Sequence, residues 1–246
     1  MGELMEGILK DKMIEHLVQN NLINKSQHGF MSKRSCLTNL LEFLEFVTEA
    51  VDHGELVDAI YLHFQKAFDN VPYVRLLDKI KARGITGKIL SWLANWLSGR
   101  QQWFVLNGNV SKWLLVLSGV PQGSILGPLL CVIFSNDIDA GIVSKLLKFA
   151  DDTKMATVVS SEEGIEKLQS DLKKLYQWAC DWQMLFNVDK CKVIHFGHSN
   201  DDGRCVYTLG SYVVKVVKEE RDLGVIVHKS LKPTSQCIEA VKSANK

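Results

Sequence analysis

The chain has 246 residues, which is enough for one large domain or two small ones. Its hydrophobic fraction of 46% predicts a packed core and argues against an intrinsically disordered chain. The net charge of +1 gives no sign of a nucleic-acid partner, although a basic segment over 72–100 could either contact phosphates or form solvated helix faces. No apolar stretch approaches the roughly 18 residues that span a bilayer.

Periodicity and turn signals predict the elements in chain order. Helices are expected near residues 3–20 and 36–53, then a strand near 57–64 and helices near 73–83 and 86–98. Strands near 101–107 and 112–118 precede a helix over about 124–138, strands near 144–150 and 153–159, and a helix near 162–181. Strands near 191–197, 205–208, 212–217 and 222–227 follow, with a polar loop at 199–203 and a last helix from about residue 233. Antiparallel strands interleaved with helices predict an α+β fold.

Two adjacent carboxylates, Asp151 and Asp152, stand between two stretches that roughly alternate. This pattern predicts two short strands joined by a tight turn with both carboxylates at its tip. Neighbouring carboxylates repel each other unless a cation or a donor network neutralises them, and Mg²⁺ binds a few carboxylate oxygens. The tip is therefore a candidate magnesium site. On the dipeptide alone, the simpler interpretation is that Asp suits a turn.

Seven ordered blocks favour the metal site. They are 27–30, 61–72, 92–100, 118–130, 149–152, 187–191 and 222–225. In this order and spacing they resemble the reverse transcriptases, or RNA-directed DNA polymerases, of non-LTR retrotransposons of the LINE and jockey type. The resemblance implies a right-hand polymerase palm, in which a ferredoxin-like antiparallel sheet packs on helices. It divides the chain into partial fingers (1–56), a palm with a primer-grip hairpin (57–228) and the start of a truncated thumb (229–246).

The resemblance also implies a reaction, the synthesis of DNA on an RNA template from a DNA primer and deoxynucleotides. Two Mg²⁺ ions roughly 4 Å apart stabilise the attacking and leaving oxygens of such a displacement. In the family, the ligands are two aspartates at the hairpin tip, here Asp151 and Asp152, and a third at the end of an earlier strand. The third position is His63. Its nitrogen suits Mg²⁺ poorly and a negative charge is lost, so we expect impaired catalysis.

Two nearby carboxylates are poor substitutes for the missing ligand. Asp58 lies five residues before His63 on the predicted strand, roughly 17 Å away at the usual strand rise. Asp69 follows the strand, and we expect its side chain to cap the helix after Pro72.

Five further positions are assigned to nucleotide binding by the resemblance alone. Phe68 stands where the family crowds the sugar 2′ position, although an ordinary core aromatic would read the same. Gln122 and Gly123 precede the predicted helix at Ser124, where a helix N-terminus offers N–H groups to phosphate or base; a plain turn with an N-cap is the alternative.

The other two positions are basic. Arg34 resembles a residue of the fingers, and Lys190 resembles a lysine proposed to protonate the leaving pyrophosphate. Solvated surface positions are the alternative for both.

Three functions stay open at this level. The first is an RNA-directed DNA polymerase domain that is impaired at His63; the second is a non-catalytic remnant that binds RNA or RNA–DNA hybrid; the third is a fragment that does not fold stably. The first residues lack the regions of a signal peptide, and six cysteines are scattered without a Cys-x-x-Cys pair. We therefore expect an intracellular protein of the nucleus or cytoplasm, with no secretion and no membrane partner.

Overall fold

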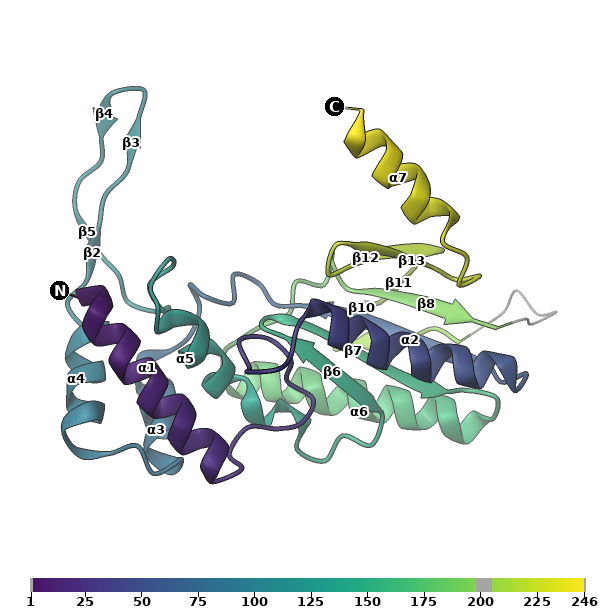
Figure 1. Ribbon diagram of the computed structural model, residues 1–246, viewed down its shortest axis with the longest axis horizontal. Coiled ribbons are helices and arrows are strands. Elements are labelled where there is room, and N and C mark those ends of the chain that lie inside the picture. The colour runs from purple at the N-terminus through teal and green to yellow at the C-terminus, as the bar shows by residue number, and fades with distance from the viewer. Residues whose placement is uncertain (1, 198–204, 246) are drawn as a thin grey trace. The chain divides into compact units, whose positions relative to one another are not determined.

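The computed structural model describes residues 2–197 and 205–245 (Figure 1). Two compact units share the chain. The first, called the helical unit here, comprises Met1–Lys25, Gln65–Ile138 and Cys180–Met184, and the second, called the sheet unit, comprises Ser26–Phe64, Asp139–Ala179 and Leu185–Lys246. The polar loop predicted at 199–203 lies outside the described residues.

A five-stranded sheet forms the centre of the sheet unit, in the order β11-β8-β1-β7-β6. Its strands are β1 (Val57–His63), β6 (Lys145–Phe149), β7 (Asp152–Val158), β8 (Lys192–Phe196) and β11 (Lys215–Val216). Strand β1 pairs antiparallel with β7 and β8, β6 pairs antiparallel with β7, and β11 is parallel to β8. β1 is buried on both faces because it is the central strand.

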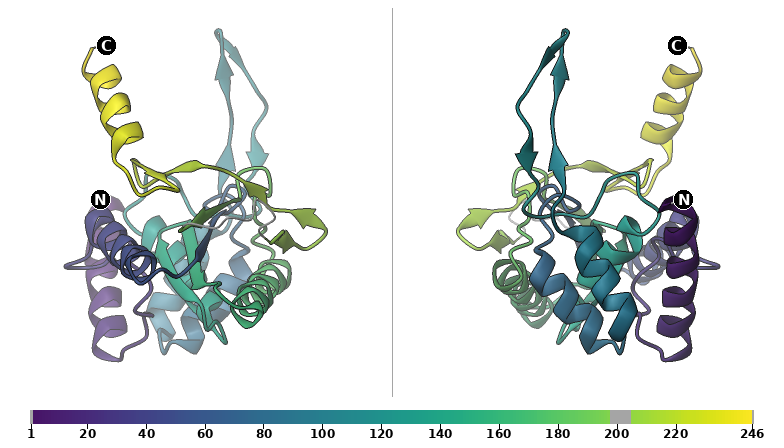
Figure 2. Two further views of the ribbon diagram at one scale, coloured as in Figure 1. Left: turned by 90° about the vertical axis from the view of Figure 1, so that its right-hand side faces the viewer. Right: turned by 90° about the vertical axis from the view of Figure 1, so that its left-hand side faces the viewer.

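Helices cover both faces of this sheet. Helix α2 (Cys36–Asp52) begins with a capping box between Ser35 and Thr38, and its apolar stripe packs on one face. There Phe43 and Val47 join the alternate β1 residues Val57, Ala59 and Tyr61 in one hydrophobic cluster. Helix α6 (Glu162–Asp181) lies on the opposite face, which receives the other β1 side chains (Figure 2).

Two hairpins and a helix complete the sheet unit. They are β9 (Thr208–Leu209) with β10 (Tyr212–Val213), β12 (Glu219–Asp222) with β13 (Val225–His228), and α7 (Thr234–Ala244). The first hairpin is linked to the sheet through a buried carboxylate: Asp58 accepts hydrogen bonds from the Tyr207 hydroxyl and from His195, each at 2.7 Å. This role of Asp58 agrees with the expectation that it does not serve the site at the far end of β1.

The helical unit contains four α-helices in its described part, α1 (Gly2–Gln19), α3 (Tyr73–Ala82), α4 (Gly87–Leu97) and α5 (Gly127–Phe134), and a 3₁₀ turn η1 (Asn136–Asp139). The segment between α4 and α5 forms a ribbon that extends away from these helices (Figure 1). The ribbon is built from two short pairs, β2 (Gln101–Gln102) with β5 (Leu114–Leu115) and β3 (Val105–Leu106) with β4 (Asn109–Val110). None of the helices in the described ranges is long and apolar enough to cross a membrane.

The predicted α+β class is confirmed, and several predicted elements are wrong in extent. The strands expected near 101–107 and 112–118 are only the short pairs of the ribbon, the strand near 205–208 is β9, and the strand near 212–217 is divided into β10 and β11. The helix expected over 124–138 is shorter, because α5 begins at Gly127, with Pro128 in its first turn, and ends at Phe134. The single strand expected over 222–227 is interrupted by a turn, since Asp222 ends β12 and Val225 begins β13. Leu223 and Gly224 both have positive φ, 47° and 91°, and they join β12 to β13 as a two-residue hairpin turn.

Candidate active site

The two aspartates lie on the turn of the β6–β7 hairpin. Phe149 pairs with Asp152, which leaves Ala150 and Asp151 as the two turn residues. Ala150 has a φ of 58°, in the left-handed region that a non-glycine residue rarely adopts. The predicted tight turn with both carboxylates at its tip is therefore present, and its backbone is held in an uncommon conformation.

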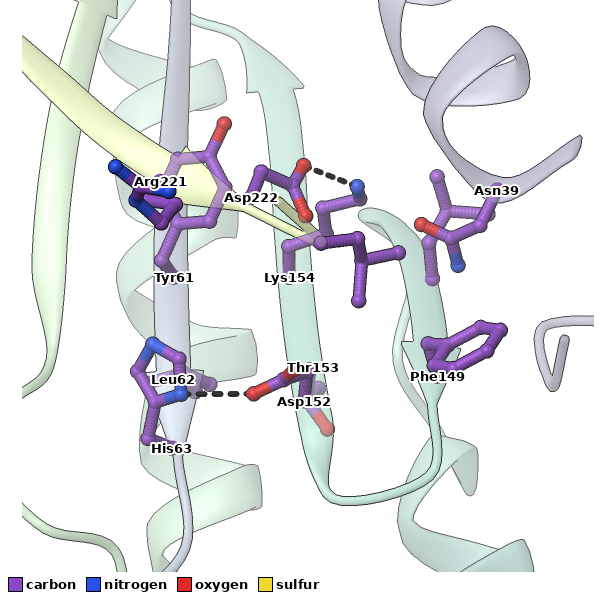
Figure 3. Close-up of a pocket in the computed structure, with 12 residues that line it drawn as sticks. Asn39, Tyr61, Leu62, His63, Phe149, Asp152, Thr153, Lys154, Arg221 and Asp222 are labelled. Atoms are coloured by element: carbon purple, nitrogen blue, oxygen red, sulfur yellow. Dashed lines mark hydrogen bonds and ion pairs between the residues drawn. The ribbon is translucent and has the colours of Figure 1, made fainter. Parts of the chain in front are cut away.

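His63 lies directly across from Asp152, because β1 and β7 are paired in that register. Its Nδ1 is 2.8 Å from Oδ1 of Asp152 (Figure 3). This hydrogen bond raises the pKa of the His63 imidazole, against an opposing effect of burial. One oxygen of the tip thus has a nitrogen donor as its partner.

Asp151 differs from its neighbour in environment. Burial raises the pKa of its carboxyl group, and the charge of Asp152 raises it further, while a backbone hydrogen bond acts in the opposite direction. A partly desolvated carboxylate of this kind binds a cation or a proton more readily than a solvated one.

A small pocket adjoins the His63–Asp152 pair, with Tyr61, Lys154 and Asp222 also in its lining (Figure 3). Its cavity volume of about 20 Å³ has room for about one water molecule and is far too small for a nucleotide. Any nucleotide would therefore bind outside this pocket.

Lys154 and Asp222 form a buried ion pair in this lining, with side chains each 5% exposed. Burial lowers the pKa of Lys154 and raises that of Asp222, and each charge opposes the shift of the other. The pair joins β12 to β7 two residues from Asp152. Sequence reasoning missed it because the two residues are 68 positions apart, and the block 222–225 that begins with Asp222 does not indicate Lys154 as its partner.

Two of the predicted nucleotide-binding residues lie in the same unit as the carboxylates. Arg34 donates from Nη1 to the backbone oxygen of Gln27 at 3.1 Å. Lys190 is exposed in a turn that its backbone N–H closes on Asn187, and its charge slightly lowers the pKa of both His63 and Asp151. Lys190 therefore acts electrostatically on this site.

The other three predicted nucleotide-binding residues, Phe68, Gln122 and Gly123, lie in the helical unit. The backbone oxygen of Phe68 accepts from Val120 at 2.7 Å, and Gln122 donates from Nε2 to Asp69 at 2.8 Å. Gly123 has a φ of 83° and open space around the position of a side chain. These contacts join the segment after β1 to the Pro-Gln-Gly turn.

The expected role of Asp69 is wrong. Helix α3 has Pro72 as its N-cap and makes no side-chain capping hydrogen bond. Asp69, three residues before Pro72, instead accepts a hydrogen bond from Gln122. Its carboxylate therefore contacts the Pro-Gln-Gly turn and does not cap α3.

The donor set does not fit a pair of magnesium ions. Within residues 2–197 and 205–245, no three His, Cys, Asp or Glu side chains are grouped where they could hold a metal ion. Mg²⁺ prefers oxygen ligands in octahedral geometry, whereas His63 brings nitrogen and donates to the very oxygen that a cation would bind.

Known proteins resemble this chain over nearly all of its length. The family described as reverse transcriptase (RNA-dependent DNA polymerase) matches residues 5–235. The RNA-directed DNA polymerase from mobile element jockey of Drosophila funebris is 28% identical over 243 residues, a match that covers 94% of this chain and 26% of that protein. The probable RNA-directed DNA polymerase from transposon X-element of Drosophila melanogaster is 26% identical over 202 residues, covering 80% of this chain and 22% of that protein.

Solved structures agree on the fold. The structure of apo telomerase from Candida tropicalis, truncated from its C-terminal domain, superposes with a TM-score of 0.60 at 12% identity and covers 92% of this chain and 44% of that one. This fold is the palm-like α+β fold of reverse transcriptases, as predicted. The chain spans about a quarter of the length of the curated relatives that it matches. On the family match over residues 5–235, the chain belongs to the reverse transcriptase family and carries a domain of the kind found in non-LTR retrotransposons.

Proposed function

We propose that this chain is a reverse transcriptase domain whose nucleotidyl transfer is impaired at His63. The observation that carries the proposal is the 2.8 Å contact between His63 Nδ1 and Asp152 Oδ1, at the tip where the family's enzymes hold divalent metal ions. The whole reaction is a proposal too, because the chain corresponds to about a quarter of its relatives. Its substrates would be an RNA template, a DNA primer and deoxynucleotides.

The assignment of roles follows the carboxylates. Asp151 and Asp152 stand at the family's catalytic metal-ligand positions, and they would hold Mg²⁺ if a third carboxylate completed the set, as in His63→Asp; the metal would then supply charge stabilisation for the displacement. A short hairpin tip suits this task because it fixes two carboxylates on one rigid element. The third ligand position is His63, and there the chain departs from what the chemistry requires.

The impairment has two physical causes. A carboxylate at position 63 would offer oxygen and a negative charge, whereas the imidazole offers nitrogen and a hydrogen-bond donor. The donor also engages Asp152, so a cation must displace it before it gains that oxygen. Loss of this electrostatic stabilisation is worth about 100-fold or more in rate, by analogy with the removal of one preorganised group from an active site.

Five residues would position the nucleotide in this proposal. Arg34 and Lys190 would meet its phosphates, Phe68 would crowd the sugar 2′ position, and Gln122 with Gly123 would approach the base or phosphate. The support is the resemblance together with local structure, such as the open space beside Gly123 that lets a ligand come close to the backbone.

The test is primer extension on an RNA template by the chain and by its His63→Asp variant, each with Mg²⁺ and with Mn²⁺. We expect little extension by the chain and at least about 100-fold more by His63→Asp. The matched control is His63→Asp with Asp152→Asn, which should return extension to the level of the chain. Equal, robust extension by the chain and by His63→Asp would refute the impairment. Binding to primer–template without extension by either protein would favour a non-catalytic nucleic-acid-binding remnant.

A further inference from the structure

A segment far from the hairpin in sequence lies against the end of β6. The backbone N–H of His28 donates to the oxygen of Lys148, and the N–H of Lys148 donates to the oxygen of Ser26, both at 2.8 Å. Asn39 also donates to the Lys148 oxygen, at 3.2 Å. Gln27, between Ser26 and His28, forms a parallel bridge with Lys148. The backbone of Gln27 is therefore held beside β6 at a position two residues before Ala150.

The side chain of Gln27 reaches that turn. Its Oε1 accepts two backbone hydrogen bonds, from Gly29 at 2.8 Å and from Ala150 at 3.3 Å. Gln27 is 1% exposed, and within the described part of the chain its Nε2 has no hydrogen-bond partner. Two N–H donors facing the same atom identify it as the amide oxygen. The unpaired Nε2 costs free energy, so the residue is poorly explained as a simple stabiliser of the core.

Gly29 leaves no spare room beside the same turn. A Cβ placed on Gly29 would overlap the backbone nitrogen of Ala150 and come within 3.1 Å of its Cα. Gly29 does not have a positive φ, so its backbone conformation does not require glycine. A side chain at this position would disturb the close contact with Ala150. Ala150 therefore donates a hydrogen bond to the Gln27 side chain and packs closely against the backbone of Gly29.

We propose that Gln27 is a positioning residue for the Asp151–Asp152 turn, with Gly29 as the surface against which the turn packs. Ala150 holds an uncommon φ of 58°, and the hydrogen bond from its N–H to Gln27 stabilises that conformation. Because the turn has only two residues, a rotation at Ala150 moves the Asp151 carboxylate directly and that of Asp152 with it. This inference rests on the proposed function, since it names the residue that sets the geometry of the same carboxylates.

The experiment compares two substitutions that remove side-chain hydrogen bonds within the sheet unit. Gln27→Met keeps the size of the side chain and removes the acceptor from Ala150. Gln169→Met is the matched control, because Gln169 exchanges hydrogen bonds of 2.9 and 2.8 Å with the backbone of Thr208, on another part of the unit. Both are made in the full chain carrying His63→Asp. Gly29→Ala perturbs the turn by contact, and its control is Gly7→Ala, where a Cβ meets nothing within 4 Å.

The readouts are hydrogen exchange at the Ala150 amide, the NMR shifts of the Asp151 and Asp152 amides, and kcat and KM of primer extension. For Gln27→Met we expect exchange at Ala150 to rise about tenfold, both aspartate amides to shift, and kcat to fall about 100-fold while KM for the nucleotide stays within about threefold. Gly29→Ala should shift the same amides. Neither control should do so.

The proposal is overturned if Gln27→Met leaves the Ala150 exchange rate and the aspartate shifts unchanged, or alters them no more than Gln169→Met does. If the His63→Asp chain extends no primer at all, the proposed function fails separately. The exchange rates and the shifts then decide the positioning role alone, by the same two criteria.

Discussion

At the scale of single residues, the chemistry of the site depends on His63, which stands where the family has an aspartate. Alternation in the sequence predicts the hairpin with Asp151 and Asp152 at its tip, and the resemblance to the family implies that His63 lies beside them. The register of β1 with β7 puts His63 opposite Asp152. The contact of Gln27 with the turn could not be predicted from the sequence, because a hydrogen bond between residues 123 positions apart leaves no periodic pattern.

The contact between His63 and Asp152 predicts a pH-dependent stability. The hydrogen bond to Asp152 raises the folded-state pKa of His63 above its ordinary value of 6.5. Folding therefore favours the protonated imidazole. This contribution to the free energy of unfolding is fully present below the unfolded pKa and is lost as pH rises through the folded pKa.

His63→Asn should accordingly destabilise the chain most near pH 5.5 and progressively less towards pH 8, as measured by urea unfolding at a series of pH values. The effect should be no more than about 1 kcal/mol, because Asp152 is 45% exposed and solvent screens the pair. In an Asp152→Asn background the same substitution should lose this pH trend. A penalty that grows with pH would contradict the assigned contact.

At the scale of elements, helix and strand bounds were predicted well only where apolar and polar residues alternate with a clear period. Helix α6 was predicted at its observed bounds, because a clear apolar stripe alternates with charged positions along 20 residues. The prediction for helix α5 was too long, because almost all of its residues are buried and an all-apolar run has no period that marks its ends. The turn at Leu223–Gly224 was overlooked, because the apolar residues after it read as a continuous strand.

The β12–β13 hairpin depends on a buried charge pair, and this predicts strong non-additivity. Removing Lys154 alone by Lys154→Met leaves the Asp222 carboxylate buried without its cation, which should cost about 3–5 kcal/mol in the free energy of unfolding. The double variant Lys154→Met with Asp222→Leu removes both charges and should recover most of that loss. Urea unfolding of the two single variants and the double variant measures the coupling.

The matched control for this cycle is the neighbouring exposed pair. Arg221 and Glu239 are 3.1 Å apart, with side chains 56% and 35% exposed, and Arg221 is adjacent to Asp222 on the same strand. Their coupling should not exceed about 1 kcal/mol. Comparable coupling in both pairs, or a double variant as unstable as the sum of its singles, would show that burial does not govern the Lys154–Asp222 interaction.

At the scale of the whole molecule, the predicted site residues are divided between the two compact units. The carboxylates, His63, Arg34 and Lys190 belong to the sheet unit, and Phe68 belongs to the helical unit with the Pro-Gln-Gly turn. The α+β class was predictable from antiparallel strands interleaved with helices, and the palm from the family resemblance that the ordered motifs carry over nearly the whole chain. Side-chain pairings such as Gln122 with Asp69 were not, since they depend on how turns of different segments meet.

The metal requirement gives a whole-molecule prediction that needs no catalysis. A ligand that binds only the folded state stabilises it by RT ln(1 + [L]/Kd), about 2.7 kcal/mol at 100 times the Kd. In the chain, His63 brings nitrogen and donates to Asp152, so Mn²⁺ should leave the melting temperature nearly unchanged. In His63→Asp, a third carboxylate at the end of β1, opposite Asp152, should bind Mn²⁺ with the tip pair and raise the melting temperature in a saturable way.

Calorimetric melting of both proteins over a series of Mn²⁺ concentrations measures this difference. The control is His63→Asp with Asp151→Asn and Asp152→Asn, which keeps the new carboxylate and removes the tip pair, so its melting temperature should not respond. An equal, saturable increase in the unaltered chain would mean that the imidazole does not obstruct cation binding. The cause of any impaired extension would then have to lie in the handling of nucleotide or primer, and the carboxylate tip would be intact.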